Sequence, residues 1–105
     1  MQEIFLSKEW ICDGNTLKPK TGATISNTWI FDGRYLKPKQ GAVSQNTWEY
    51  DGRYLKPIIR ASSSNTWEKN GEILKPQTGA NSRNTYNTKG YPILVVWAQV
   101  ILNLW

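Results

Sequence analysis

Few residues in this chain of 105 could do chemistry. The chain has no His, which excludes His-based general acid–base catalysis, Ser-His and Cys-His pairs, and His-ligated metal sites. Its one thiol, Cys12, cannot close an intramolecular disulfide or build a zinc site. We expect Cys12 to be a small apolar filler within a strand.

The eight carboxylates offer little more. Glu49 and Glu68 occupy equivalent places in two sequence repeats, and a carboxylate pair is what a glycosidase uses, but no third element accompanies them. Asp13, Asp32 and Asp51 each precede a glycine, where Asp favours turn geometry. The chain has no P-loop, dinucleotide-binding glycine pattern or metal-ligand cluster. We therefore predict that it is not an enzyme and has no catalytic residues, metal site or cofactor.

A nineteen-residue period organises the sequence. Aromatic residues stand at this interval from Trp10 to Tyr86, and glycine, leucine and Lys-Pro recur with them. One unit has the form N-T-W-x-x-D-G-x-x-L-K-P-x-x-G-A-x-x-x. Because such a unit cannot bury its own apolar face, the copies must stack. We expect a single domain over 1–105, with a cap at 1–8, repeats at about 9–27, 28–46, 47–65 and 66–84, and an apolar terminal repeat at 85–105.

Each unit predicts a β-hairpin. Asp-Gly or Asn-Gly between two β-prone runs favours a type I′ turn, in which both central residues have positive φ. A two-residue turn at Asp32-Gly33 would place Trp29 opposite Leu36, and the other units would repeat this aromatic–aliphatic pair. Proline lacks a ladder donor, so Lys-Pro would end the second strand. The expected repeated core is Trp10, Trp29, Trp48, Trp67, Tyr86, Leu17, Leu36, Leu55 and Leu74.

An alternative geometry makes nineteen residues one coil of a β-solenoid, with Asp-Gly and Lys-Pro at the corners. Trp29 would then stack on Trp48 instead of facing Leu36. We favour hairpins because Asp-Gly favours a tight reversal of the chain. The expected fold class is all-β: tandem nineteen-residue β-hairpin repeats stacked into a prism-like or solenoid-like array, with an apolar C-terminal strand.

The two ends of the sequence are more apolar than its middle. The β-branched residues between Ile93 and Ile101 favour a strand. That strand could close the core within the chain or, together with the apolar residues near Met1, form an oligomer interface. A membrane-interacting segment is a third alternative, disfavoured because the run is short and lacks a basic flank on its C-terminal side. The residues of the expected interface are Trp97, Val100, Leu102, Leu104, Trp105, Ile4, Phe5 and Leu6.

Basic residues outnumber acidic ones, thirteen to eight, which gives a net charge of +5. This balance suits acidic partners, and it also keeps a Trp-rich protein soluble. Stacked copies would align the lysine of each Lys-Pro into a row, where lysines also prevent edge-to-edge aggregation. Neighbouring tyrosines could stack on sugar rings or bases. The expected ligand or anion surface is Lys18, Lys37, Lys56, Lys75, Arg34, Arg53, Tyr35 and Tyr54.

These features favour a non-catalytic repeat scaffold or assembly module, a self-associating structural or surface component that forms a homo-oligomer. The first alternative is a module that binds a glycan or another polymer through surface aromatic residues. The second is nucleic-acid binding through the lysine row. The hairpin-repeat organisation resembles, in outline, the aromatic hairpin repeats of choline-binding modules, but the spacing and the L-K-P element differ, so no site residue is carried over.

The location of the protein follows from what the sequence lacks. The segment from Met1 to Trp10 has no basic n-region and no long apolar core, so we do not expect a signal peptide. The apolar run from Ile93 to Leu104 is shorter than the roughly 20 residues of a membrane-spanning helix. We expect a protein of the cytoplasm or of a phage particle, without a membrane partner.

Overall fold

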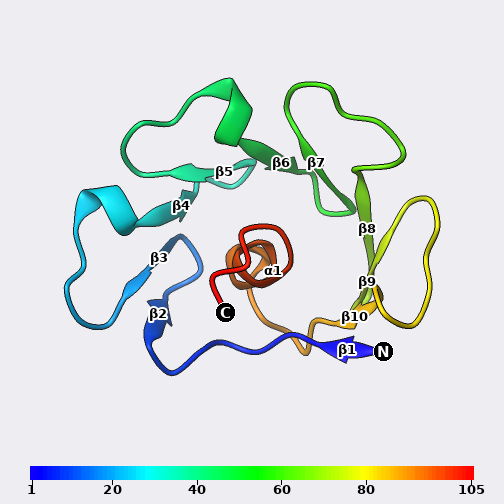
Figure 1. The fold of residues 1–105 in the computed structure, drawn as a ribbon, viewed down its shortest axis with the longest axis horizontal. Coiled ribbons are helices and arrows are strands. Elements are labelled where there is room, and N and C mark those ends of the chain that lie inside the picture. Colours follow the sequence, from blue (N-terminus) through cyan, green and yellow to red (C-terminus); the bar gives the residue numbers. More distant parts are fainter.

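The computed structural model describes residues 1–105 and is mostly β, with one ten-stranded sheet and one short α-helix. The helix, α1 (Ile93–Val100), lies in the middle of the molecule, and the sheet curves around it (Figure 1). Short 3₁₀ turns lie at Ile25–Asn27 and Ser44–Asn46. The strands are β1 (Gln2–Glu3), β2 (Trp10–Cys12), β3 (Thr16–Pro19), β4 (Trp29–Phe31), β5 (Tyr35–Pro38), β6 (Trp48–Tyr50), β7 (Tyr54–Pro57), β8 (Trp67–Asn70), β9 (Ile73–Pro76) and β10 (Tyr86–Asn87).

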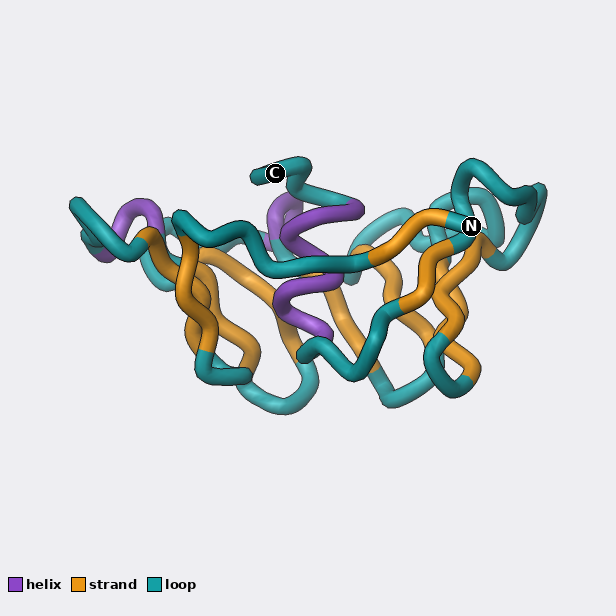
Figure 2. The backbone as a smooth tube through the Cα atoms, turned by 90° about the horizontal axis from the view of Figure 1, so that it is seen from below, coloured by secondary structure: helices purple, strands orange, loops and turns teal.

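The strand order in the sheet is β1-β10-β9-β8-β7-β6-β5-β4-β3-β2, and from β10 to β2 each strand pairs antiparallel with its neighbours. Only β1 pairs in parallel, with β10. The sheet is open, and the segment between β1 and β2 runs along the side where it does not close (Figure 1). The hairpin turns lie at one end of the strands, and the connections to the next hairpin lie at the other end, where they spread outward (Figure 2).

The hairpins are present, but the predicted register is wrong by two residues. Trp29 pairs with Pro38 instead of Leu36, and Phe31 takes the place opposite Leu36. In this hairpin the Oδ1 of Asp32 accepts hydrogen bonds from the backbone N–H groups of Arg34 (3.0 Å) and Tyr35 (2.8 Å), an Asx turn that stabilises the loop. The β8–β9 hairpin has the same register without such bonds at Asn70, so the Asx turn accompanies this register and is not required for it. Because side chains alternate with a period of two, the displacement leaves the same side chains facing inward.

The predicted aromatic–aliphatic pair therefore joins successive hairpins and does not form within one. Leu36 lies opposite Trp48 of the next hairpin, and Leu55 lies opposite Trp67. The solenoid alternative, in which Trp29 stacks on Trp48, does not describe these antiparallel pairs. The corresponding pairs at the two ends of the series are Leu17 with Trp29 and Leu74 with Tyr86.

The prediction of an apolar C-terminal strand is wrong, because Ile93–Val100 forms α1. This segment lies inside the curved sheet, and each residue from Ile93 to Ala98 is buried. A single strand there would leave its backbone N–H and C=O groups unpaired in an apolar interior, whereas a helix pairs them internally. That requirement overrides the β propensity of Val95 and Val96. A helix that is apolar all round is typical of a central position.

The core lies between α1 and the inner face of the sheet. Leu17, Leu36, Leu55 and Leu74 have no exposed surface, and neither does Trp97 of α1. The sheet residues Trp10, Trp29, Trp48, Trp67 and Tyr86 are half-buried and pack against this cluster.

The connections between hairpins are held by the recurring Asn-Thr pair. We define the return segments as residues 20–27, 39–46, 58–65 and 77–84. In the first, the Oδ1 of Asn27 accepts from the Thr24 N–H (2.7 Å), and its Nδ2 donates to the Gly22 carbonyl (3.1 Å). Thr28 donates its hydroxyl to the Thr24 carbonyl (2.6 Å). Equivalent bonds to Asn46, Asn65 and Asn84 fix the other three segments.

Candidate functional site

The predicted ligand surface lies on the outer face of the sheet, away from α1. Each lysine of the Lys-Pro series follows a buried leucine, so strand alternation turns it outward. In register, Lys56 lies opposite Glu49 and Lys75 lies opposite Glu68. On the same face, in the hairpins nearer the N-terminus, Lys18 lies opposite Ile11, and Lys37 lies opposite Ile30. The lysines thus alternate with carboxylates on one half of this face and with aliphatic residues on the other.

Two equivalent clusters of Arg, Tyr and Glu occupy the middle of this face. In the first, the Arg34 guanidinium pairs with the Glu49 carboxylate (Nε–Oε2 2.6 Å) and lies over the Tyr35 ring, 5.3 Å from its centroid. Tyr35 itself lies opposite Glu49 in the β5–β6 ladder. We call this set the first Arg–Tyr–Glu cluster.

The second Arg–Tyr–Glu cluster repeats these partners one hairpin further along. Arg53 donates both Nε (3.0 Å) and Nη2 (2.8 Å) to Glu68 Oε2, where Arg34 donates Nε alone, and it lies 5.3 Å from the centroid of the Tyr54 ring. Tyr54 lies opposite Glu68 in the β7–β8 ladder. The Arg-to-Glu separation of fifteen residues is the same in both clusters. The sequence singled out the arginines and tyrosines of these clusters but not the two glutamates as their partners.

Aspartates in the hairpin turns position the clusters. The carboxylate of Asp32 accepts from the N–H groups of Tyr35 and Arg34, and Asp51 does the same for Tyr54 and Arg53. These backbone hydrogen bonds hold the pKa of both aspartates below the usual carboxyl range. Each aspartate therefore remains ionised at neutral pH and fixes the backbone on which the Arg and Tyr side chains stand.

Local pairing neutralises most of the positive charge in the clusters. The hydrogen bond to Glu49 raises the pKa of Arg34, and the hydrogen bond to Glu68 raises that of Arg53. Lys37 lies 3.6 Å from the Asp32 carboxylate. The surface is therefore a pattern of close donors and acceptors, not an uninterrupted positive row.

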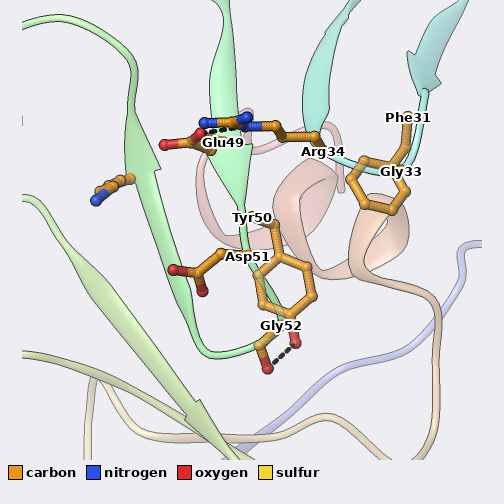
Figure 3. Close-up of a pocket in the computed structure, with 8 residues that line it drawn as sticks. Phe31, Gly33, Arg34, Glu49, Tyr50, Asp51 and Gly52 are labelled. Atoms are coloured by element: carbon orange, nitrogen blue, oxygen red, sulfur yellow. Dashed lines mark hydrogen bonds and ion pairs between the residues drawn. The ribbon is translucent and has the colours of Figure 1, made fainter.

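An open hollow of about 710 Å³ lies beside the first cluster, between the β4–β5 and β6–β7 turns. Figure 3 shows Arg34 reaching toward Glu49 on one side of it, with Tyr50, Asp51 and Gly52 on another. The Tyr50 hydroxyl donates to the Gly52 carbonyl (3.0 Å). Burial raises the pKa of this hydroxyl, so it stays protonated. Such a hollow offers polar contacts on a partly aromatic surface, with Phe31 completing the wall.

No group of three or more Cys, Asp and Glu residues is placed to hold a metal ion. Cys12 is half-buried, and burial raises the pKa of its thiol, which makes it a poor nucleophile at neutral pH.

The predicted oligomer interface is largely occupied within the chain. Trp97 and Ile4 lie inside the core and cannot form part of an interface. Trp105 donates its indole N–H to the Phe5 carbonyl (2.7 Å), although the Phe5 side chain itself is exposed. The remaining members of that set are half-buried and pack against the core: Leu6, Val100, Leu102, Leu104 and Trp105.

No helix in the structure has the length and apolar character that crossing a bilayer requires. Comparison with known protein families, curated proteins and solved structures finds no match to this chain.

Proposed function

We propose that this protein is a non-catalytic module that binds a polysaccharide along the outer face of its sheet, at the two Arg–Tyr–Glu clusters. The observation that carries the proposal is the duplication itself. The same three residue types meet on adjacent hairpins, each with an Arg–Glu ion pair and with the guanidinium 5.3 Å from the tyrosine ring centroid. A duplicated site suits a ligand that is itself a repeated chain. Each nineteen-residue unit, taken as a structural repeat, would present the same outer-face positions to such a ligand.

Each cluster presents hydrogen-bonding groups in a fixed arrangement. Arg34 has a side chain that is 67% exposed, yet its head is held by Glu49 and by the Tyr35 ring. Glu49 uses only Oε2 in this pair, which leaves Oε1 as an acceptor. Vicinal sugar hydroxyls need a donor and an acceptor side by side. Groups that are already ordered lose less entropy when a ligand binds.

The tyrosines supply the remaining contacts. The hydroxyls of Tyr35 and Tyr54 make no hydrogen bond within the protein, although Tyr50 in the neighbouring hollow does. Tyr combines an apolar ring with a polar end, which suits the mixed surface of a sugar. The two clusters are two strands apart, about 10 Å by ordinary strand spacing. One extended saccharide chain can therefore contact both.

Charge pairing favours a polysaccharide over a nucleic acid. Nucleic-acid binding depends on free Lys and Arg that release counterions from phosphates, so its affinity falls steeply with salt. Here both cluster arginines are already paired with carboxylates, and Lys56 and Lys75 lie opposite the same two glutamates. We expect binding that changes little with salt.

A glycan array followed by calorimetric titration of the best ligand tests the proposal. The double variant Tyr35→Ala/Tyr54→Ala should weaken binding at least about tenfold, because it removes from each cluster a ring contact and a hydroxyl that can bond the ligand. Thr16→Ala/Ile73→Ala is the matched control, because these residues occupy the same position in the flanking hairpins. Absence of any glycan ligand, or equal losses in both variants, would contradict the proposal.

Assembly into a homo-oligomer is the second candidate function, supported by β2 at an edge of the open sheet. An edge strand offers unpaired backbone groups to a second copy. Ile11 in this strand is 47% exposed. Light scattering should then give a defined multimer that Ile11→Lys dissociates. A clean monomer at high concentration would count against assembly.

A further inference from the structure

The return segments form a rim at one end of the molecule. Because they connect β3 to β4, β5 to β6, β7 to β8 and β9 to β10, antiparallel pairing puts all four at the same end of the sheet. Figure 2 shows these connections spreading outward at the end opposite the hairpin turns. The molecule extends 37 × 29 Å across its two longer axes and 20 Å along the third. The rim thus borders a broad face.

The rim carries positive charge only. Each return segment contains one basic residue, and every one of them is exposed: Lys20, Lys39, Arg60 and Arg83. None of the eight acidic residues lies in a return segment. The carboxylates are placed near the N-terminus, in the hairpin turns and on the strands. The four return segments therefore carry +4 of the net charge of +5, and Lys8 and Glu9, which lie beside Lys20, add no net charge to this end.

Exposed aliphatic side chains stand among these charges. Ile25 is 54% exposed and Val43 is 53% exposed, and Ile58 and Ile59 are exposed as well. These four make up most of the seven large apolar side chains that the structure exposes. They are spread over three segments and do not gather in one patch.

One rim position holds a basic residue at a conformational cost. Arg60 has φ 57°, in the left-handed region, where the equivalent residues of the other segments are Gly22, Gly41 and Gly79. A non-glycine residue there costs roughly 1–2 kcal/mol. The third segment has Ile58 at the position that holds Lys20 and Lys39 in the first two. Arg60 therefore supplies the positive charge that the third segment would otherwise lack. Strained residues of this kind point to a function for the side chain.

We propose that the rim docks on the surface of a bilayer that contains anionic lipids. Basic residues attract the headgroups, and the aliphatic side chains enter the headgroup boundary between them. A fluid lipid surface can take up apolar side chains that are separated from one another, as these four are. A protein partner would need a contiguous apolar patch. A nucleic acid would use the charges but not the aliphatic side chains, and the return segments contain no aromatic residue on which a base could stack.

Sedimentation with lipid vesicles tests this proposal. The protein should bind vesicles of phosphatidylcholine and phosphatidylserine at low salt, and should bind pure phosphatidylcholine much less. Lys20→Gln/Lys39→Gln should weaken binding about 25-fold, which is roughly fivefold for each charge. Lys69→Gln/Lys89→Gln is the matched control, since it removes the same charge at the hairpin-turn end of the molecule, and should change binding only a few-fold.

A second pair of variants tests the aliphatic contacts. Ile25→Ser/Val43→Ser should weaken vesicle binding on the order of tenfold, and Ile11→Ser, an equally exposed residue on the outer face, should not. Failure to sediment with the anionic vesicles would overturn the proposal. So would equal affinity for duplex DNA together with no effect of the serine substitutions, because the rim would then be a general polyanion site.

Discussion

Leu36 on β5 lies opposite Trp48 on β6, so the buried leucine of one hairpin packs beside the aromatic residue of the next. Leu55 and Trp67 repeat the arrangement across the following junction. Each hairpin therefore depends on its neighbour for part of its apolar contact. This interlocking gives the outer face a fixed geometry, on which the two Arg–Tyr–Glu clusters stand.

Replacement of Leu55 tests this packing. Leu55→Ala removes a side chain that has no exposed surface, and we expect a loss of about 2–5 kcal/mol in the free energy of unfolding. Ile59→Ala, an exposed aliphatic residue, should change it by less than about 0.5 kcal/mol. Urea denaturation of both variants provides the measurement, and similar losses would contradict the assigned core.

Trp97 tests the position of α1. Its ring lies edge-on to Trp29, 5.6 Å between centroids, and its buried indole N–H has no hydrogen-bond partner. Trp97→Ala should cost about 3–5 kcal/mol. Trp97→Phe should cost much less, because it keeps an aromatic ring and removes an unpaired donor. Thermal unfolding of the two variants measures the difference, and a Phe variant as unstable as the Ala variant would argue against this environment.

Gln99 tests how the N-terminal segment is held. Its side chain accepts from the Phe5 N–H (2.9 Å) and donates to the Glu3 carbonyl (3.0 Å). Gln99→Ala should cost about 1–3 kcal/mol and should speed amide hydrogen exchange near Phe5. The exposed Gln77→Ala serves as the control. Unchanged exchange at Phe5 in Gln99→Ala would show that this residue does not hold the segment.

The turn aspartates predict a loss of stability in acid. Backbone hydrogen bonds lower the pKa of Asp13, Asp32 and Asp51 below the usual value of 3.8. Their folded pKa lies below the unfolded one, so the stabilisation is present above about pH 4 and is lost as the pH falls through the folded pKa. Replacing all three by Asn keeps an acceptor oxygen but removes the titration. Urea midpoints should be measured from about pH 6 down to about pH 2, a range that covers the titration of carboxyl groups. The midpoint should fall less in this variant than in the unchanged protein, and parallel curves would contradict the assignment.

The sequence predicts the strands and the places where the chain reverses. Trp and Leu at a fixed interval, with Asp-Gly between them, are sufficient to indicate hairpins such as that of Trp29–Phe31 with Tyr35–Pro38. The register could not be predicted from residue types alone, because Asp-Gly also fits a two-residue type I′ turn and the Trp and Leu side chains face inward in either register. Once that register is known, the fifteen-residue spacing of Arg34 and Glu49 identifies the cluster.

The C-terminal helix could not be predicted from local propensity. Ile93 to Val100 is rich in β-branched residues, which favour a strand. Its central position is a property of the whole chain, since the curved sheet encloses it and leaves no neighbouring strand to pair with. Only the apolar character of both faces of the segment signalled complete burial.

The affinity for saccharides of increasing length tests the central claim most directly. If one chain contacts both Arg–Tyr–Glu clusters, affinity should rise sharply at the length that spans them and then level off, because the second contact becomes intramolecular. Arg53→Ala should abolish that rise while leaving the affinity for short saccharides nearly unchanged. An affinity that does not depend on length, or a rise that survives in Arg53→Ala, would contradict the account.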